Sequence, residues 1–345
     1  MSEARDLPRS TVQCDPGELL RFSRQVLESI RVPVAFAADM AGQIVASEVS
    51  GHESHGLRRL AEYVDRAREG FADPQAVPAV DKDQGSLVRI DGGFGFGHVI
   101  MREATRIAVE RAKQHGIAAV AVHRAEPAGR FVDFCEWAAQ LGVATLIFVN
   151  SGGGGQVVAP PGGAEARLST NPIAAGIPRP AAPHLVLDMA TSTVAMGRVS
   201  EWRDRGTSLP AEWTDGSGVL QFVGAGKGFG LALIAEALAG VLSSAGAVSA
   251  HPEGDRQGVF MIAIDVERLR PLTDFAEHVD ACIDHVKDVP LSSAGEQVLV
   301  PGERSALTAE ARRAVTPVQA FTWESLRLLA GSLQIAPPRS KEERS

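Results

Sequence analysis

Three short apolar segments in the middle of the chain constrain its fold most. IAAVAVH (117–123), VATLIFVN (143–150) and HLVLDMA (184–190) are each bounded by glycine, proline or the start of a helical pattern. Short apolar runs with such boundaries are typical of strands buried on both faces of a sheet. Helical patterns alternate with these segments at about 131–141, 191–204 and 228–243. The sequence therefore predicts an α/β fold.

The chain before this region is predicted to be mainly helical. PGELLRFSRQVLESI (16–30) and VAFAADMAGQIVA (34–46) carry apolar residues at helical spacing, and an apolar stripe predicts a further helix over 55–69. SLVRI (86–90) is predicted to be a strand, and 99–116 a long helix that ends at a glycine.

The composition excludes several classes of protein. With 345 residues, of which 45% are hydrophobic and 22% charged, the chain is typical of a globular protein with two or three subdomains. Its formal net charge of −8 argues against nucleic acid as the main partner. Three scattered cysteines predict thiols in a reducing compartment. Because neither a signal peptide nor a membrane span is visible, we expect a cytoplasmic protein.

The segment SGHESHGLRR (50–59) concentrates side chains that can do chemistry. His52 and His55 are three residues apart, which suggests a zinc site, although the H-E-x-x-H spacing of zinc proteases is not met. In a second interpretation, a helix begins near Ser54, His55 supplies a proton, and Arg59 holds a substrate carboxylate one turn later. In a third, Ser54 is a helix N-cap and the other side chains are solvated. The segment alone leaves these interpretations open.

Two glycine-rich segments resemble nucleotide-binding motifs without completing either. DGGFGFGH (91–98) lies between a predicted strand and a helix, but it lacks the third glycine of the G-x-G-x-x-G fingerprint. GAGKGFG (224–230) is not a P-loop. That motif has glycine at the position of Gln221 and serine or threonine at the position of Gly228. Lys227 is either an anion-binding lysine at a helix start or an exposed side chain.

Two further features have alternative interpretations. The glycine- and proline-rich segment 150–172 is either a functional loop or a surface excursion. Asp188 ends an apolar strand just before a helix start at Thr191 or Ser192. A carboxylate in that position is either catalytic or a helix cap.

Five segments, taken in chain order, are similar to the blocks of one known family. They are SGHESHGLRRLAEY (50–63), LSTNPIAAGIP (168–178), LVLDMATS (185–192), KGFGLAL (227–233) and VPGER (300–304). They resemble the type-2 malate/L-lactate dehydrogenase family, which also contains ureidoglycolate and sulfolactate dehydrogenases and Δ1-piperideine-2-carboxylate/Δ1-pyrroline-2-carboxylate reductases. The resemblance covers roughly residues 16–332.

This resemblance implies a fold and a domain organisation. The fold would be a non-Rossmann α/β fold with three layers, a mixed sheet and an additional helical domain. Residues 14–115 with 299–333 would form the helical domain, which serves dimerisation and substrate binding. Residues 116–298 would form the cofactor-binding α/β domain, and 334–345 a disordered tail. A homodimer with its active site near the subunit interface is implied as well.

The resemblance also implies roles for individual residues. Ser54, His55 and Asp188 would form a catalytic relay, in which His55 is the proton donor. Arg59 would hold the substrate carboxylate, and Thr170 would contact the substrate. The residues implied to approach the cofactor are Gly129, Arg179, Lys227, Gly302, Glu303 and Arg304. No metal is expected at this site.

The chain departs from the family pattern in two places. Many members carry a histidine where this chain has Pro127, and His123 is close in sequence but out of register. The loop at 217–224 is shorter than is usual in the family. Both changes fall near the implied substrate position, so they predict an unusual substrate or an altered use of the scaffold.

The expected activity is the NAD(P)H-dependent reduction of a C=N or C=O bond next to a carboxylate. The substrate would be a cyclic imino acid such as Δ1-piperideine-2-carboxylate, or else a 2-oxo acid. NADPH is expected, with NADH possible, because Arg179 and Arg304 could meet a 2′-phosphate. The alternatives are a divergent member without redox chemistry, acting as a lyase, isomerase or binding protein, and a zinc hydrolase.

Overall fold

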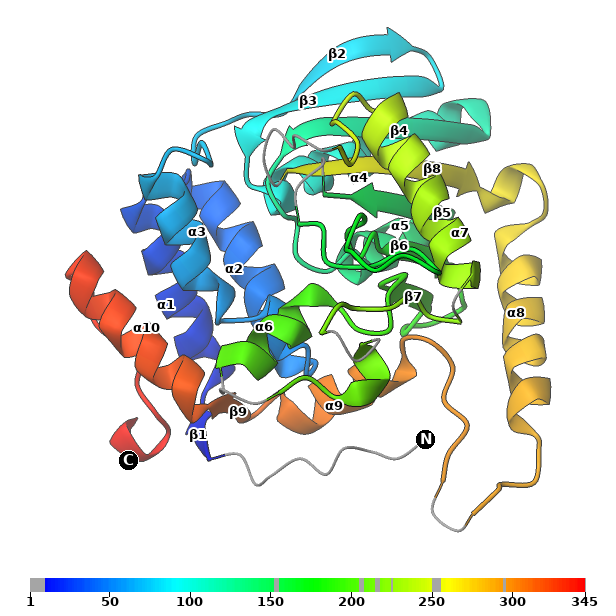
Figure 1. Cartoon of the computed structure of the whole chain (residues 1–345). Helices are drawn as coiled ribbons and strands as arrows, with labels where there is room; N and C mark the ends of the chain where they lie inside the picture. Colours follow the sequence, from blue (N-terminus) through cyan, green and yellow to red (C-terminus); the bar gives the residue numbers. More distant parts are fainter. Residues whose placement is uncertain are drawn as a thin grey trace.

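A seven-stranded mixed sheet forms the centre of the molecule (Figure 1). The structure, a computed structural model, describes residues 10–151, 155–204, 208–214, 218–224, 226–249, 256–293 and 296–344. In sheet order, the strands are β2 (Ala79–Gln84), β3 (Leu87–Gly95), β4 (Ile117–Ala125), β8 (Gln257–Asp265), β5 (Val143–Asn150), β6 (Ile173–Ile177) and β7 (Leu185–Met189). β3 and β4 are parallel, whereas the other neighbouring strands are antiparallel.

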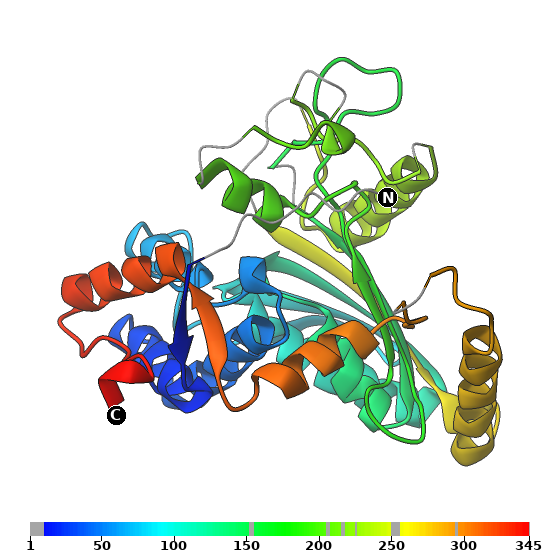
Figure 2. The same ribbon diagram turned by 90° about the horizontal axis from the view of Figure 1, so that it is seen from below.

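Helices cover both faces of this sheet (Figure 2). One face is covered by α4 (Gly97–His115) and α5 (Val132–Gln140), and the other by α7 (Gly226–Ala235) and a π-helix at Glu236–Leu242. The alternation along β5 accounts for this arrangement. Ile147 packs in the core beneath α4 and α5, while the next residue, Phe148, packs against Ala235 on the opposite side. The expected three-layer α/β fold is confirmed.

A helical domain lies beside the sheet (Figure 1). It contains α1 (Pro16–Ser29), α2 (Val34–Val49), α3 (Arg59–Arg68) and α10 (Ala320–Leu333). Their apolar faces share one core, which includes Phe22, Met40 and Leu60. The side chain of Asp15 accepts the N–H groups of Gly17 and Glu18 and so starts α1. The two ends of the domain are joined by pairing of β1 (Thr11–Cys14) with β9 (Thr316–Gln319).

The remaining elements lie around these two cores. They are α6 (Met196–Asp204), α8 (Leu272–Lys287), α9 (Glu303–Arg312) and 3₁₀ turns at Glu53–His55, Ala211–Trp213, Val266–Arg268 and Glu342–Arg344. In α8, which stands at the outer edge of the molecule (Figure 2), Ala276 and Ile283 are buried. Where a disordered tail was expected, Lys341 donates its N–H to the carbonyl oxygen of Gln13 at 2.8 Å.

The domain boundary expected at residue 115 falls within the layered sheet. β2, β3 and α4, all before that residue, pair or pack with β4 after it. The functional roles assigned to the two domains stay predictions. Among the described helices, none is long and apolar enough to cross a membrane.

Candidate active site

The turn that presents His55 differs from the predicted helix start. Residues Glu53–His55 form a 3₁₀ turn, and α3 begins at Arg59 instead of near Ser54. The reason is the buried carboxylate of Glu48, which accepts the N–H of Leu57 at 3.0 Å. A Cβ at Gly56 would lie 2.1 Å from that carboxylate, so any side chain there would displace it. His55 and Arg59 are therefore placed by a turn and not by one continuous helix.

Ser54 and His55 form a hydrogen-bonded pair. The distance between Ser54 Oγ and His55 Nδ1 is 3.0 Å. Burial, reinforced by the Arg59 and Arg130 guanidinium groups, lowers the pKa of His55 to about 3. The imidazole is consequently neutral at neutral pH. With Ser54 as the donor, Nδ1 accepts and the ring proton lies on Nε2.

Arg59 lies on the wall of a pocket of about 390 Å³ next to this pair. The pocket is lined from α3, α6 and α10, and Ser54 contributes to its wall. Arg59 Nη1 forms an ion pair with Glu62 Oε2 at 2.6 Å, and its guanidinium lies 5.9 Å from the ring centroid of Tyr63. A substrate carboxylate that binds Arg59 would compete with Glu62 for the same charge.

The Asp188 carboxylate contacts the backbone at the start of α5. Within the described residues, the side chains of Asp188 and His55 share neither a hydrogen bond nor an ion pair. The Asp188 carboxylate instead accepts the N–H groups of Phe131 at 2.7 Å and Val132 at 3.4 Å. It therefore caps the start of α5. Burial raises its pKa, against these hydrogen bonds and the Arg130 charge.

His52 and Glu53 attach the turn to the C-terminal elements. His52 Nε2 lies 2.8 Å from Ser305 Oγ on α9. Gln319 Nε2, at the end of β9, donates to Glu53 Oε2 at 2.8 Å. In the part of the chain that the structure describes, no group of three or more potential metal-binding side chains lies together.

Three of the residues expected at the cofactor lie close together. Arg179 Nε forms an ion pair with Asp280 Oδ1 at 2.6 Å, and a pocket of about 460 Å³ adjoins Arg179. Gly302 has a φ of +98°, and a Cβ there would lie 3.0 Å from the carbonyl oxygen of His184, which lines the same pocket. Glu303 follows and starts α9. Although burial opposes it, the pKa of Glu303 is lowered, mainly by the ion pair with Lys287 and the N–H of Val300, with a smaller contribution from Arg179.

The other expected contact residues are distributed more widely. Arg304 is exposed on α9. Lys227 is exposed at the start of α7. The carbonyl oxygen of Thr170 accepts the N–H and the hydroxyl of Thr191, both at 2.9 Å. Gly129, with a φ of +73°, packs against His98, whose Nε2 would be 2.6 Å from a Cβ there.

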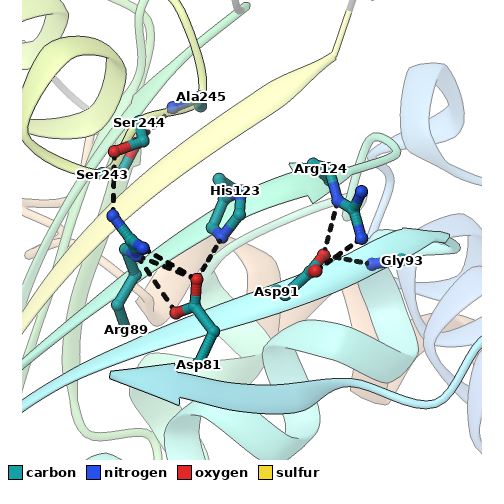
Figure 3. Close-up of polar contacts among 9 residues, drawn as sticks. All are labelled: Asp81, Arg89, Asp91, Gly93, His123, Arg124, Ser243, Ser244 and Ala245. Carbon is teal, nitrogen blue, oxygen red and sulfur yellow. Dashed lines mark hydrogen bonds and ion pairs between the residues drawn. The ribbon is translucent and has the colours of Figure 1, made fainter. Parts of the chain in front are cut away.

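His123 belongs to a polar network on the sheet (Figure 3). Its Nε2 lies 3.1 Å from Asp81 Oδ2, and Arg89 Nη2 pairs with the same oxygen at 2.8 Å. Asp91 pairs with Arg124 alongside. These contacts join β2, β3 and β4. They hold the His123 side chain on the sheet, so it does not stand in for the histidine that many family members carry at the position of Pro127.

The shortened loop contributes to a small separate core. Leu220 and Phe222 are buried there together with Val158 and Val194. Residue 217, at the start of the loop, lies outside the described residues. The predicted effect on the active-site wall therefore stays a prediction.

Two site residues were not found from the sequence. Arg130 is buried among Ser47, Asp133 and the groups around His55. His98 is a buried imidazole whose ring meets that of Tyr63 edge-on at 5.5 Å. Neither stands in a recognisable motif. The signal that Arg130 offers is a basic residue directly before the helix predicted at about 131–141.

The chain is similar to known dehydrogenases and reductases. The family described as malate/L-lactate dehydrogenase matches residues 14–327. An L-lactate dehydrogenase from Cupriavidus necator is 32% identical over 340 residues, covering 92% of this chain and 97% of that protein. Delta(1)-pyrroline-2-carboxylate reductase 2 from Burkholderia multivorans is 32% identical over 248 residues, covering 68% and 72%. The structure of malate dehydrogenase from Pyrococcus horikoshii OT3 matches with a TM-score of 0.87 and 29% identity, covering 98% of this chain and 100% of that chain.

Proposed function

Because the chain belongs to the malate/L-lactate dehydrogenase family and is an oxidoreductase, we propose that it interconverts a small 2-hydroxy acid and its 2-oxo acid with a nicotinamide cofactor. The observation that carries this proposal is the neutral His55, bonded to Ser54 next to the pocket that holds Arg59. A neutral imidazole can accept the proton of a hydroxyl group, and an arginine can bind a carboxylate through two hydrogen bonds.

In the proposed reaction, His55 transfers the proton and Arg59 binds the carboxylate. A bound nicotinamide would supply the redox chemistry, as the acceptor of a hydride from C2 of the hydroxy acid or the donor of one to the oxo acid. His55 takes the hydroxyl proton during oxidation and gives it back during reduction. To accept that proton at Nε2, the neutral ring carries its own proton on Nδ1 and donates it to Ser54 Oγ, which is the other tautomer that the 3.0 Å contact allows. Arg59 orients the carboxylate.

The region around Gly302 fits a dinucleotide. Gly302 has no Cβ, which allows its positive φ and leaves the backbone at the N-terminus of α9 open to close approach. A helix N-terminus of this kind favours a phosphate group. Gly302, Glu303 and Arg304 would hold the cofactor there together with Arg179, while Lys227 and Gly129 stay as proposed contacts from the sheet side. NADPH stays the expected form, although Asp280 already pairs with Arg179.

A cyclic imino acid is the second candidate substrate. The similarity to the Burkholderia multivorans reductase supports it. The same groups would serve, with His55 supplying a proton to the nitrogen and Arg59 holding the ring carboxylate. The relatives named above are dehydrogenases and a reductase, and they give the non-redox alternative no support.

A substrate screen tests the proposal. The protein is assayed with 2-hydroxy acids, 2-oxo acids and cyclic imines, each with both nicotinamide forms, at the nicotinamide absorbance. The best substrate is then given to His55→Gln and to His52→Gln, a histidine of the same turn. We expect turnover to fall by at least about a hundredfold in the first variant and to change little in the second. Unchanged turnover in His55→Gln would exclude the assigned role.

We also propose a homodimer in the cytoplasm, with Thr170 and Asp188 near the substrate. Sedimentation of the purified protein tests the dimer. The free Cys14 and Cys135 are buried, which is compatible with a reducing compartment.

A further inference from the structure

Glu236 is a buried carboxylate that the proposed reaction does not use. It is 6% exposed and stands where α7 passes into the π-helix. Its Oε1 accepts Nδ2 of Asn150 at 3.1 Å and the N–H of Val248 at 2.7 Å. Its Oε2 accepts Nδ2 of Asn171 at 2.8 Å. Because Asn150 ends β5 and Asn171 lies just before β6, the carboxylate joins this helix to the ends of two neighbouring strands.

Two general observations make this place in the fold unusual. Glutamate is almost never fully buried unless it is paired or hydrogen-bonded, and an apolar residue would fill the same space without needing partners. A π-helical turn inside a helix is rare and frequently occurs at a functional site. The partners of Glu236 should therefore show what the carboxylate holds.

Asn171 has a strained backbone conformation. Its φ is +27°, although it is not a glycine and directly precedes Pro172. A Cβ disfavours positive φ, and a residue before proline normally adopts an extended conformation. Strain of this kind persists only where the surrounding structure holds it, and it occurs most often at active sites and ligand-binding sites. The conformation of Asn171 thus depends on its contacts.

The side chain of Asn171 is held by the helix. Its Nδ2 donates to Glu236 Oε2 and, at 3.2 Å, to the carbonyl oxygen of Ala232 in α7. Asn171 is fully buried, and its Oδ1 has no hydrogen-bond partner among the described residues. On the C-terminal side, the carbonyl oxygen of Pro172 accepts the N–H of Val149 in β5 at 3.1 Å. Without Glu236, only the longer of the two side-chain bonds would oppose the strain.

Thr170, the expected substrate contact, directly precedes this strained residue. Its carbonyl oxygen accepts the N–H and the hydroxyl of Thr191, both at 2.9 Å, and its side chain is half-buried. The backbone is therefore anchored by Thr191 on one side of the Thr170–Asn171 peptide and by Glu236 on the other. If Asn171 relaxed toward an extended conformation, the peptide would turn and the Thr170 side chain would move.

We propose that Glu236 is a positioning residue of the active site: it holds Asn171 in its positive-φ conformation and thereby sets the position of the Thr170 side chain. That Thr170 touches the substrate rests on the proposed function. The hold of Glu236 on Asn171 and Thr170 is a property of the ligand-free protein, so it can be measured without a substrate.

The first experiment measures this hold by NMR of isotope-labelled threonine methyl groups. The Thr170 signal is assigned by its loss in Thr170→Val. Glu236→Gln keeps the size of the side chain but turns an amide N–H2 group toward N–H donors. Asn171→Ala and Asn171→Gly both remove the side-chain bond, and only glycine tolerates the positive φ. Ser243→Ala is the matched control, because it removes a buried hydroxyl that donates to the Ala239 carbonyl oxygen of the same helix.

We expect the Thr170 signal to move in Glu236→Gln and in Asn171→Ala, and to move less in Asn171→Gly. It should stay in place in Ser243→Ala. An unmoved signal in folded Glu236→Gln overturns the proposal, and so does an equal movement in the control. If Glu236→Gln does not fold, the two Asn171 variants decide, since equal movement in alanine and glycine would mean that the strain is not what is held.

The second experiment measures kinetics with the best substrate of the screen. In Glu236→Gln we expect KM to rise by about tenfold or more, while kcat changes by less than about threefold. Thr170→Val should raise KM similarly, and the double variant should be no worse than either single variant, because both act on one contact.

Additive effects in that double variant would mean that Glu236 does not act through Thr170, and would overturn the proposal. A fall in kcat that matches the loss of folded protein, with KM unchanged, would mean that Glu236 is only structural. If no substrate is turned over but the Thr170 signal moves as expected, the proposed function fails and the hold of Glu236 on Thr170 stands.

Discussion

The carboxylate of Glu48 accepts the N–H of Leu57 at 3.0 Å, and Gly56 lies directly against that carboxylate. This contact fixes where the 3₁₀ turn ends and where α3 begins. Because His55 immediately precedes Gly56, the buried carboxylate of a different helix sets the position of the proposed base.

A side chain at Gly56 should disturb this arrangement. In Gly56→Ala the new Cβ would lie 2.1 Å from Glu48 Oε2, so the carboxylate must move. We expect a loss of about 1–3 kcal/mol in the free energy of unfolding, by the usual effect of overpacking, together with a loss of activity. Urea unfolding measures it. Gly42→Ala, on α2 with no atom within 4 Å of its Cβ, is the control and should be neutral or slightly stabilising.

Glu62 should weaken substrate binding. Its carboxylate forms an ion pair with the Arg59 guanidinium and so competes with a substrate carboxylate for that group. In Glu62→Gln we expect KM for the carboxylate substrate to fall by roughly two- to fivefold, with kcat nearly unchanged. Arg59→Lys should raise KM by at least about tenfold, since lysine cannot make the two parallel hydrogen bonds. Glu69→Gln, in the same pocket, is the matched control. An unchanged KM in both Glu62→Gln and Arg59→Lys would contradict the assignment of Arg59.

Asp280 should affect the choice between NADH and NADPH. Its carboxylate pairs with Arg179 at 2.6 Å and so offsets the charge that a 2′-phosphate would need. In Asp280→Asn we expect kcat/KM for NADPH, relative to NADH, to rise by roughly three- to tenfold. Asp284→Asn, one turn further along α8, is the control. A ratio that changes equally in both variants would mean that Arg179 is not near the 2′ position.

His98 should make the protein sensitive to acid. Burial and the Arg59 charge lower its pKa to about 3, whereas an unfolded histidine titrates near pH 6.5. As the pH falls below about 6.5, His98 binds a proton in the unfolded chain but stays neutral in the folded protein. The free energy of unfolding therefore decreases. This loss of stability is absent well above pH 6.5 and grows as the pH falls toward 3.

The pH dependence of unfolding checks this prediction. Between pH 6.5 and 5.5 the contribution of His98 should amount to about 1 kcal/mol. The variant His98→Phe should therefore lose about that much less stability over the interval than the wild type. His285→Phe, at an exposed histidine of α8, should behave like the wild type. Equal losses in all three proteins would rule out a buried neutral His98.

The sequence predicts the strands that carry long apolar runs, and it misses those without one. β4, β5 and β7 are found because each is apolar and sharply bounded. β2 is exposed along its whole length, and it is defined by pairing with β3 rather than by burial. β6 lies in NPIAAGIP, where the flanking prolines and the glycine mask the strand signal.

The sequence groups those candidate residues that are close along the chain. Ser54, His55 and Arg59 come from one segment, and the structure keeps them together. Arg130 and His98 contact residues that are distant in sequence, Ser47 and Tyr63 respectively. The spacing of residues within one segment cannot predict such contacts. Similarly, the start of α3 depends on Glu48, which belongs to the preceding helix. The roles assigned to Asp188 and to the cofactor residues stay predictions.

The position of β8 has a consequence for how the chain acquires its structure. β8 (Gln257–Asp265) lies between β4 and β5, which precede it by more than a hundred residues. During synthesis, the two halves of the sheet cannot join until this late strand has left the ribosome. Closing loops of this length slows folding and favours all-or-none assembly. A truncated chain that ends before β8 should therefore leave the facing edges of β4 and β5 unpaired, and unpaired strand edges favour aggregation.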